Sequence, residues 1–216
     1  TLVFSGEGGS SAQSAIDTTA AGDLWDNGSG FYATGSSPLA AEAGNNSMLY
    51  TLPSIVDDLT LKASYSPGSA GGSSATSWSA TYAGVEGLSV SYGTGQVETI
   101  GSEADVTTMK ASYAYGPVTL AYSDHEFDSA TATRDQDVTS YSIAYTVTDG
   151  ISVTYGTETF DSGETAIDAE YSKVSVAYTS GGMTITAVSA EGENISYSTA
   201  AAEDVDYWGL TVAFAF

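Results

Sequence analysis

The last eleven residues, DYWGLTVAFAF (206–216), decide the fold class. Large apolar side chains occupy every second position from Trp208 to Phe216, and the positions between them carry mostly small residues. Successive side chains of a β-strand point to opposite faces, so this pattern predicts a strand with one continuous apolar face. Such a face is buried in a protein core or in lipid, and the rest of the sequence must distinguish the two.

The same alternation recurs along the chain and predicts about twelve strands. They are expected near residues 1–7, 47–54, 59–65, 78–84, 88–95, 108–116, 118–125, 141–148, 151–158, 171–179, 183–190 and from about 205. Gly, Pro and Asp predict tight turns near 56–58, 84–87, 115–117, 148–150 and 180–182. Longer connections, rich in Ser, Thr, Gly and acids, are expected at 67–77, 96–106, 126–137, 160–168 and 191–204. Short and long connections therefore alternate, as they do in transmembrane β-barrels, whereas a soluble sandwich has no reason to sort its loops.

Tyrosines mark one end of the expected strands. Tyr82, Tyr115, Tyr145 and Tyr178 all fall close to the tight turns, as in the aromatic girdle at a membrane interface. The alternative is that they fill a sandwich core, but a core would use more Phe, Leu and Ile, and each buried hydroxyl would need a partner. The sequence thus favours an all-β, antiparallel transmembrane β-barrel. Its strands are expected to close, because every backbone polar group in a bilayer must be paired.

Composition narrows the class of protein further. The chain of 216 residues carries 27 acids against 4 bases, a net charge of −23 that repels nucleic acid. It has no cysteine and no apolar run of the length of a membrane helix. We expect residues 1–216 to form a single barrel domain.

The aromatic terminal strand, the loop alternation and one outsized connection together resemble Gram-negative outer-membrane porins, especially the trimeric general-diffusion porins of alphaproteobacteria. The connection is 8–45, between the strands expected at 1–7 and 47–54. In sixteen-stranded porins the third outer loop follows the fifth strand, folds into the barrel and narrows the pore. If 8–45 is that loop, the chain resembles a porin without its first four strands, although twelve is also an even number that could close a smaller barrel.

The resemblance also implies location, partners and activity. It implies a homotrimer in the outer membrane of a Gram-negative bacterium, in contact with the lipid bilayer, that lets ions and small hydrophilic solutes diffuse passively. Trp208, Phe214 and Phe216 resemble the signal that the barrel assembly machinery reads during biogenesis. No enzymatic activity is implied.

Because the chain has only 4 basic residues, the position of each lysine is informative. Lys62, Lys110 and Lys173 all fall on the polar face of their strands. One reason is that a lysine facing lipid costs about 2–4 kcal/mol at the bilayer midplane. The other is a basic strip on the pore wall that faces acids on the inserted loop, for which the candidates are Asp17, Asp23, Asp26 and Glu42. Because acids dominate, we expect a weak to moderate cation preference.

Other chemistry finds little support in the sequence. His125 is the single histidine, which disfavours a zinc site and a catalytic triad, and no cofactor is expected. Acids at 135–137 and 203–206 could bind Ca²⁺ weakly on outer loops, but they lack calcium-loop spacing. The competing functions are a secreted, acidic all-β adhesin or structural domain, which leaves the loop sorting unexplained, and a barrel enzyme, which lacks a catalytic set.

Overall fold

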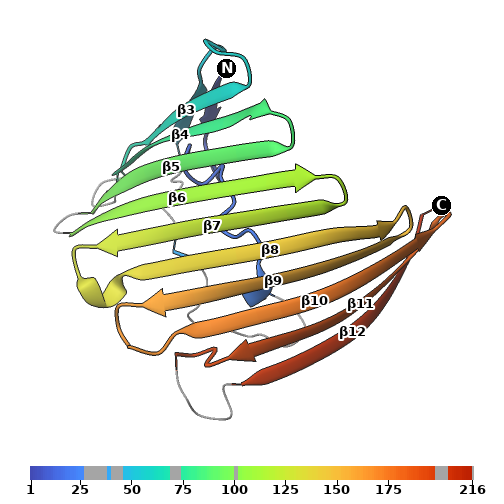
Figure 1. The fold of residues 1–216 in the computed structure, drawn as a ribbon. Helices are drawn as coiled ribbons and strands as arrows, with labels where there is room; N and C mark the ends of the chain where they lie inside the picture. Colours follow the sequence, from blue (N-terminus) through green and yellow to red (C-terminus); the bar gives the residue numbers. More distant parts are fainter. Residues whose placement is uncertain (27–37, 40–45, 69–73, 100–101, 198–203, 216) are drawn as a thin grey trace.

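The part of the chain that the structure describes forms a single curved antiparallel sheet of twelve strands in sequence order (Figure 1). The computed structural model describes residues 1–26, 38–39, 46–68, 74–99, 102–197 and 204–215. The strands are β1 (Leu2–Ser5), β2 (Ser47–Thr51), β3 (Leu59–Ser66), β4 (Ser74–Val85), β5 (Leu88–Thr99), β6 (Ser102–Tyr115), β7 (Val118–Ser129), β8 (Gln136–Thr148), β9 (Ile151–Ser162), β10 (Ala169–Ser180), β11 (Met183–Glu193) and β12 (Val205–Phe214). Two short 3-10 helices, η1 (Leu24–Asp26) and η2 (Ala132–Arg134), lie in connections. The predicted number and order of strands are confirmed.

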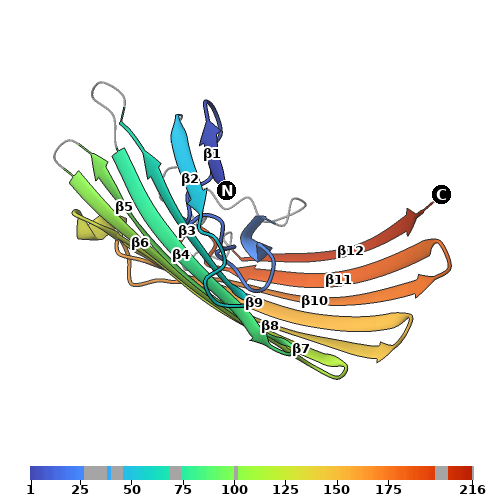
Figure 2. The ribbon, with the colours of Figure 1, turned by 90° about the horizontal axis from the view of Figure 1, so that it is seen from above.

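The sheet bends into a trough, as Figure 2 shows from above. Each strand pairs with its sequence neighbours, so β1 and β12 lie at the two edges, and no ladder joins these edges among the described residues. The expected closure is therefore not made by these twelve strands in the described part of the chain. The trough is the wall of a barrel, with a concave inner face and a convex outer face. No helix among the described residues has the length and apolarity needed to cross a membrane.

The two faces of the wall have opposite chemistry. In the β11–β12 ladder, Trp208 lies opposite Ser189 and Phe214 opposite Met183. Trp208 is 80% exposed and Phe214 is 59% exposed, so the apolar face of the closing strand points away from the protein interior. Exposed large apolar side chains on β3 to β11, such as Tyr92, Ile143 and Val176, continue this surface around the wall. An outward apolar surface of this extent fits hydrocarbon rather than water.

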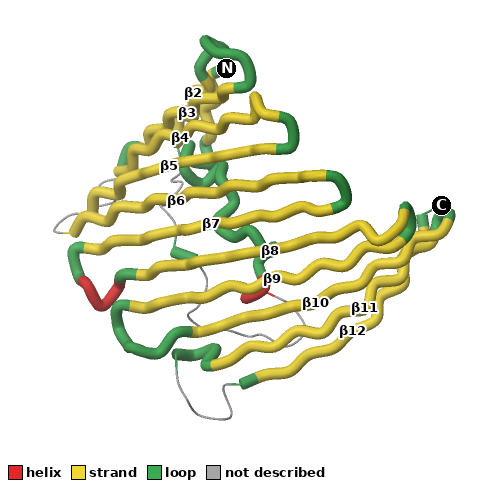
Figure 3. Tube along the Cα trace, viewed as in Figure 1, coloured by secondary structure: helices red, strands yellow, loops and turns green. Residues whose placement is uncertain are grey.

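The connections correct part of the prediction. Tight turns do lie at one end of the wall, between β4 and β5, β6 and β7, β8 and β9, and β10 and β11 (Figure 3). At the other end the strands run further than expected: β5 extends to Thr99 and β6 begins at Ser102, inside the long loop expected at 96–106. The connection between β2 and β3, expected as a tight turn at 56–58, comprises residues 52–58.

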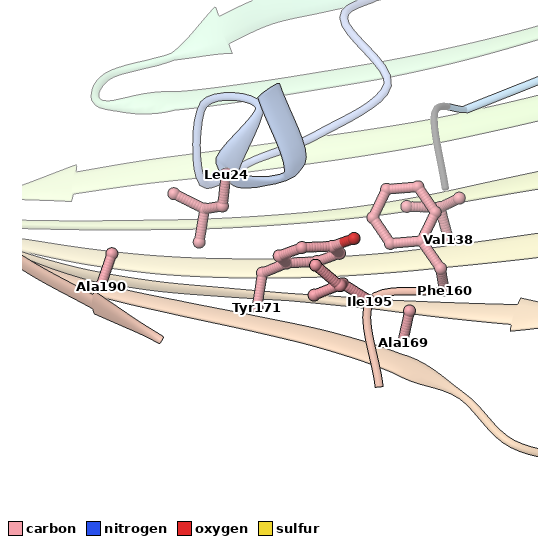
Figure 4. Packing of buried hydrophobic residues seen from close by; sticks show 7 residues of the cluster. All are labelled: Leu24, Val138, Phe160, Ala169, Tyr171, Ala190 and Ile195. Carbon is pink, nitrogen blue, oxygen red and sulfur yellow. The ribbon is translucent and has the colours of Figure 1, made fainter. Parts of the chain in front are cut away.

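A small apolar core lies inside the trough rather than between two sheets (Figure 4). Leu24 of η1 packs there with inward side chains that include Phe160 of β9 and Tyr171 of β10, and with Ile195 of the connection after β11. The Phe160 and Tyr171 rings meet edge to face at 5.7 Å between centroids. Burial of these groups holds η1 against the inner wall, because removing apolar surface from water is favourable.

Candidate functional site

Residues 11–26 cross the inner face of the wall from β3 to β9, and we call them the cross-wall segment. Inward serine hydroxyls bind its backbone strand by strand. Ser64 of β3 accepts from the Ala12 N–H at 2.9 Å, and Ser140 of β8 accepts from the Ala20 and Ala21 N–H groups at 3.0 and 2.9 Å. Ser77 likewise accepts from the Gln13 N–H, whereas Ser123 and Ser142 donate to the carbonyls of Thr18 and Ala20. The segment therefore lies across the strands, on their hydroxyl groups.

Small residues allow this close approach. A Cβ atom built on Gly93 of β5 would lie 2.9 Å from Ile16 Cδ1 and 3.3 Å from Gln13 Cα. A Cβ atom on Gly156 of β9 would lie 2.8 Å from Ala21 Cβ. Gly156 is thus required by the close approach of Ala21, whereas at Gly93 a larger residue would need the Ile16 side chain to shift. The inner face of the wall is shaped to receive the cross-wall segment at both of its ends.

One ion pair joins the segment to the wall within the described part of the chain. Lys110 Nζ of β6 lies 2.6 Å from Asp17 Oδ2 and also donates to the Thr19 carbonyl at 2.7 Å. Lys110 and Asp17 were both expected at this site, and the structure brings these two residues together. Lys62 and Lys173 also lie on the inner face, opposite Ser79 and Gly156, without a described contact to a segment acid. The basic strip is therefore spread along the wall, and among the described residues only its Lys110 member contacts an expected acid.

Glu158 of β9 is a second attachment point, which sequence reasoning missed. Its side chain is fully buried, and Oε2 accepts from the Trp25 backbone N–H at 3.2 Å. Oε1 has no partner among the described residues. The sequence does contain a sign of this position, because Glu158 lies two residues from both Gly156 and Phe160 and therefore on the same inward face of β9. A buried carboxylate is costly unless it binds donors, so its position indicates a specific role in holding the segment.

His125, for which the sequence indicated no role, lies buried on the inner face of β7 and joins two parts of the 8–45 connection. Its Nε2 lies 2.5 Å from the Leu39 carbonyl, and its Nδ1 lies 2.7 Å from Thr108 Oγ1. Thr108 in turn binds Gln13 Nε2 at 2.6 Å. His125 therefore acts as a structural anchor for residues 13 and 39. No group of three or more potential metal ligands occurs among the described residues.

The other expected site residues fall into three groups. Asp23 has a φ of 52° and closes a turn in which Thr19 Oγ1 donates to its Oδ1 at 2.8 Å, while Asp26 is exposed on η1. Glu42 and Phe216 lie outside the described residues. The expected interface tyrosines, Tyr82, Tyr115, Tyr145 and Tyr178, are all exposed on the outer face near the tight turns.

A cluster of acids on the outer face was also missed. Asp124, Glu126, Asp137, Asp161 and Asp168 line one surface hollow towards the end of the wall opposite the tight turns. Asp137 lies directly opposite both Glu126 and Asp161 in the ladders. Burial, and then the charge of Asp161, raises the pKa of Asp168 above its usual value. Acids occupy the outward positions that carry apolar residues elsewhere on these strands. The alternation of apolar and polar residues is therefore lost at this end of the wall.

Comparison with solved structures gives the same architecture at low sequence identity. The anion-selective porin from Comamonas acidovorans matches with a TM-score of 0.62 and 16% identity over 80% of this chain and 60% of that one. A porin refined at 1.8 Å resolution matches with a TM-score of 0.61 and 20% identity over 93% and 72% of the two chains. OmpT of Vibrio cholerae, an outer-membrane protein, matches with a TM-score of 0.57 and 16% identity. The present chain spans 64% of the length of OmpT.

Comparison with protein families decides between the alternatives that the sequence left open. A search of the curated proteins found no match. The family model of the Gram-negative porins matches residues 4–195, which is most of the chain. This match favours the porin over the adhesin and places the protein in the bacterial outer membrane. The outward apolar surface, the polar inner face and the sequence match agree: the chain belongs to the Gram-negative porin family.

Proposed function

We propose that the chain forms the wall and the constriction of a water-filled channel through which ions and small hydrophilic solutes diffuse passively. The observation that carries the proposal is the path of the cross-wall segment. It runs over the polar inner face and is held there by Ser64, Ser140 and Lys110. A segment held inside a barrel narrows the lumen. Polar groups on the inner wall and on the segment keep the lumen filled with water.

The channel is expected to prefer cations weakly to moderately. Asp17 is offset by Lys110, but Asp23 and Asp26 remain on the segment without a described ion pair. The summed charge of the chain, −23, adds a negative potential that concentrates cations in a low-dielectric passage. This preference is opposite to that named for the porin from Comamonas acidovorans, which is anion-selective.

The test is the conductance of the full-length protein, with its native N-terminus, in a planar lipid bilayer. We expect stepwise, ohmic openings and a reversal potential of the cation-selective sign in a salt gradient. Asp23→Asn with Asp26→Asn should move the reversal potential towards zero. An absence of openings from correctly folded protein would overturn the channel, and an anion-selective reversal potential would overturn the preference alone.

We also propose that the assembled protein is a homotrimer surrounded by lipid and that the barrel assembly machinery recognises its terminal strand. Family membership supports both proposals. Openings in groups of three, together with a trimer mass by native mass spectrometry, would support the assembly. Phe214→Ala should lower the yield of assembled protein if the aromatic strand is read during biogenesis.

A further inference from the structure

A pocket on the cross-wall segment is lined by residues that carry a donor and an acceptor left unpaired within the described part of the chain. It has a volume of about 290 Å³, and its lining includes Gln13, Ile16, Asp17, Asp23, Trp25 and Pro38. We propose that this pocket is a binding subsite for small organic cations that carry a primary ammonium group and an oxygen acceptor, such as a basic amino acid. The proposal rests on the proposed channel function, and it adds a specific solute class to general diffusion.

Two buried polar atoms on lining residues lack a partner among the described residues. They are Gln13 Oε1 and Trp25 Nε1. Gln13 is fully buried, so an unbonded oxygen there is costly unless a ligand or water supplies a donor. One unsatisfied acceptor and one unsatisfied donor, both on residues of a single pocket, match a ligand that has groups of both kinds.

The hydrogen-bond chain behind the pocket fixes the orientation of the Gln13 amide. The Leu39 carbonyl can only accept, so His125 Nε2 must carry a proton. In the neutral ring Nδ1 then accepts from the Thr108 hydroxyl, and the Thr108 oxygen is left to accept from Gln13 Nε2. Gln13 Oε1 is therefore the amide atom that remains unpaired in the part of the chain that the structure describes, and it requires a donor such as an ammonium N–H.

The charge of the pocket also favours an ammonium group. Asp17 is already paired with Lys110 at 2.6 Å, whereas Asp23 receives only the Thr19 hydroxyl and has no described ion pair. Asp23 therefore supplies the spare negative charge. The Trp25 ring, with Ile16 and Pro38, supplies apolar surface for a short carbon chain, and an aromatic face also attracts cations. The Trp25 Nε1–H can donate to a carboxylate or hydroxyl oxygen of the same ligand.

Two probes separate the contribution of Asp23 to ammonium binding from that of Trp25 to carboxylate binding. They are L-lysine and cadaverine, which is lysine without its carboxylate. The full-length protein is titrated with each probe in a bilayer at about 0.1 M salt, where charges within about 10 Å still interact. The readout is the concentration that halves the conductance. Asp23→Asn should weaken both probes about fivefold, since Asn preserves the shape and tolerates the positive φ of 52°. Trp25→Phe should weaken lysine about threefold and leave cadaverine unchanged.

Asp26→Asn is the matched control. It removes the same charge from the same segment, but Asp26 does not line the pocket. The subsite is overturned if the wild type shows no saturable block, or if Asp26→Asn and Asp23→Asn have equal effects, which would indicate a general field. Calorimetric titration of folded protein in detergent with the same probes tests the subsite even if no conductance is seen, so failure of the channel and failure of the subsite are distinguishable.

Discussion

Ser140→Ala tests whether the serine contacts hold the cross-wall segment in place. Ser140 is fully buried on β8, and its hydroxyl oxygen accepts from two successive backbone N–H groups, those of Ala20 and Ala21. Removal of one oxygen therefore leaves two donors without their partner. No other side chain in the described residues accepts from either donor, so no neighbouring side chain compensates for the two lost hydrogen bonds.

The size of the effect follows from this count. A typical intramolecular hydrogen bond contributes about 1 kcal/mol to stability, so the loss of two amounts to about 2 kcal/mol. Water in the pore can reach the freed N–H groups, which keeps the cost near this value rather than at the full desolvation penalty. Local opening of the segment should therefore become about thirtyfold more frequent.

Amide hydrogen exchange of the folded protein measures this opening directly. We expect exchange at Ala20 and Ala21 to accelerate about thirtyfold in Ser140→Ala, while the amides of β8 keep their protection. Ser175→Ala is the control, since Ser175 lies on the inner side of β10 and makes no described side-chain hydrogen bond to the segment. Unchanged exchange at residues 20 and 21, or equal acceleration throughout β8, would refute the local role of the hydroxyl.

Three further predictions address stability. Leu24→Ala should lower the unfolding free energy by about 2–4 kcal/mol, because it leaves a cavity in the apolar core inside the trough. The temperature at which the folded band disappears on a gel reports the change. Asp137→Asn should raise that temperature by about 2 °C at low ionic strength, since it removes a carboxylate that lies opposite two others, and the gain should vanish in molar salt. Val174→Arg, on the outer face, should cost about 2–4 kcal/mol in a bilayer, whereas Ser175→Arg, one residue later on the inner face, should assemble normally; equal yields of folded protein would contradict the orientation of β10.

Period-two patterning predicted the strands well where a strand faces lipid. In β12 the contrast between Trp208 and Gly209 is large, because one neighbour meets hydrocarbon and the next faces the interior. The pattern failed at the start of β6, where the outward residues are Glu103 and Asp105. The inward face there carries Ala104 and the buried Val106, so the alternation is reversed relative to the lipid-facing part of the strand, although the backbone ladder continues.

The site was less predictable than the wall. Lysine and acid were expected to face each other, and Lys110 with Asp17 does so. The roles of Ser140 and His125 could not be read from the sequence, because inward serines occur on most strands. Which of them meets the segment depends on the path of residues 11–26 in space, and that path is set by contacts more than 100 residues apart in sequence, such as Ala20 with Ser140.

The distribution of charge over the site places exposed carboxylates without a described ion pair on the cross-wall segment. Lys110 is the wall base with a described contact to the segment, and Asp17 with the Thr19 carbonyl already occupies two of its three N–H donors. Glu158 is buried, and its carboxyl group faces the Trp25 backbone rather than the open lumen. The carboxylates of Asp23 and Asp26 have no described ion pair and lie on the piece of chain that crosses the trough. A permeating ion would therefore meet segment carboxylates over a hydroxyl-lined wall on which Lys62 and Lys173 have no described contact with a segment acid. Sequence changes in residues 17–26 would alter ion preference without disturbing the ladders that hold the barrel wall together.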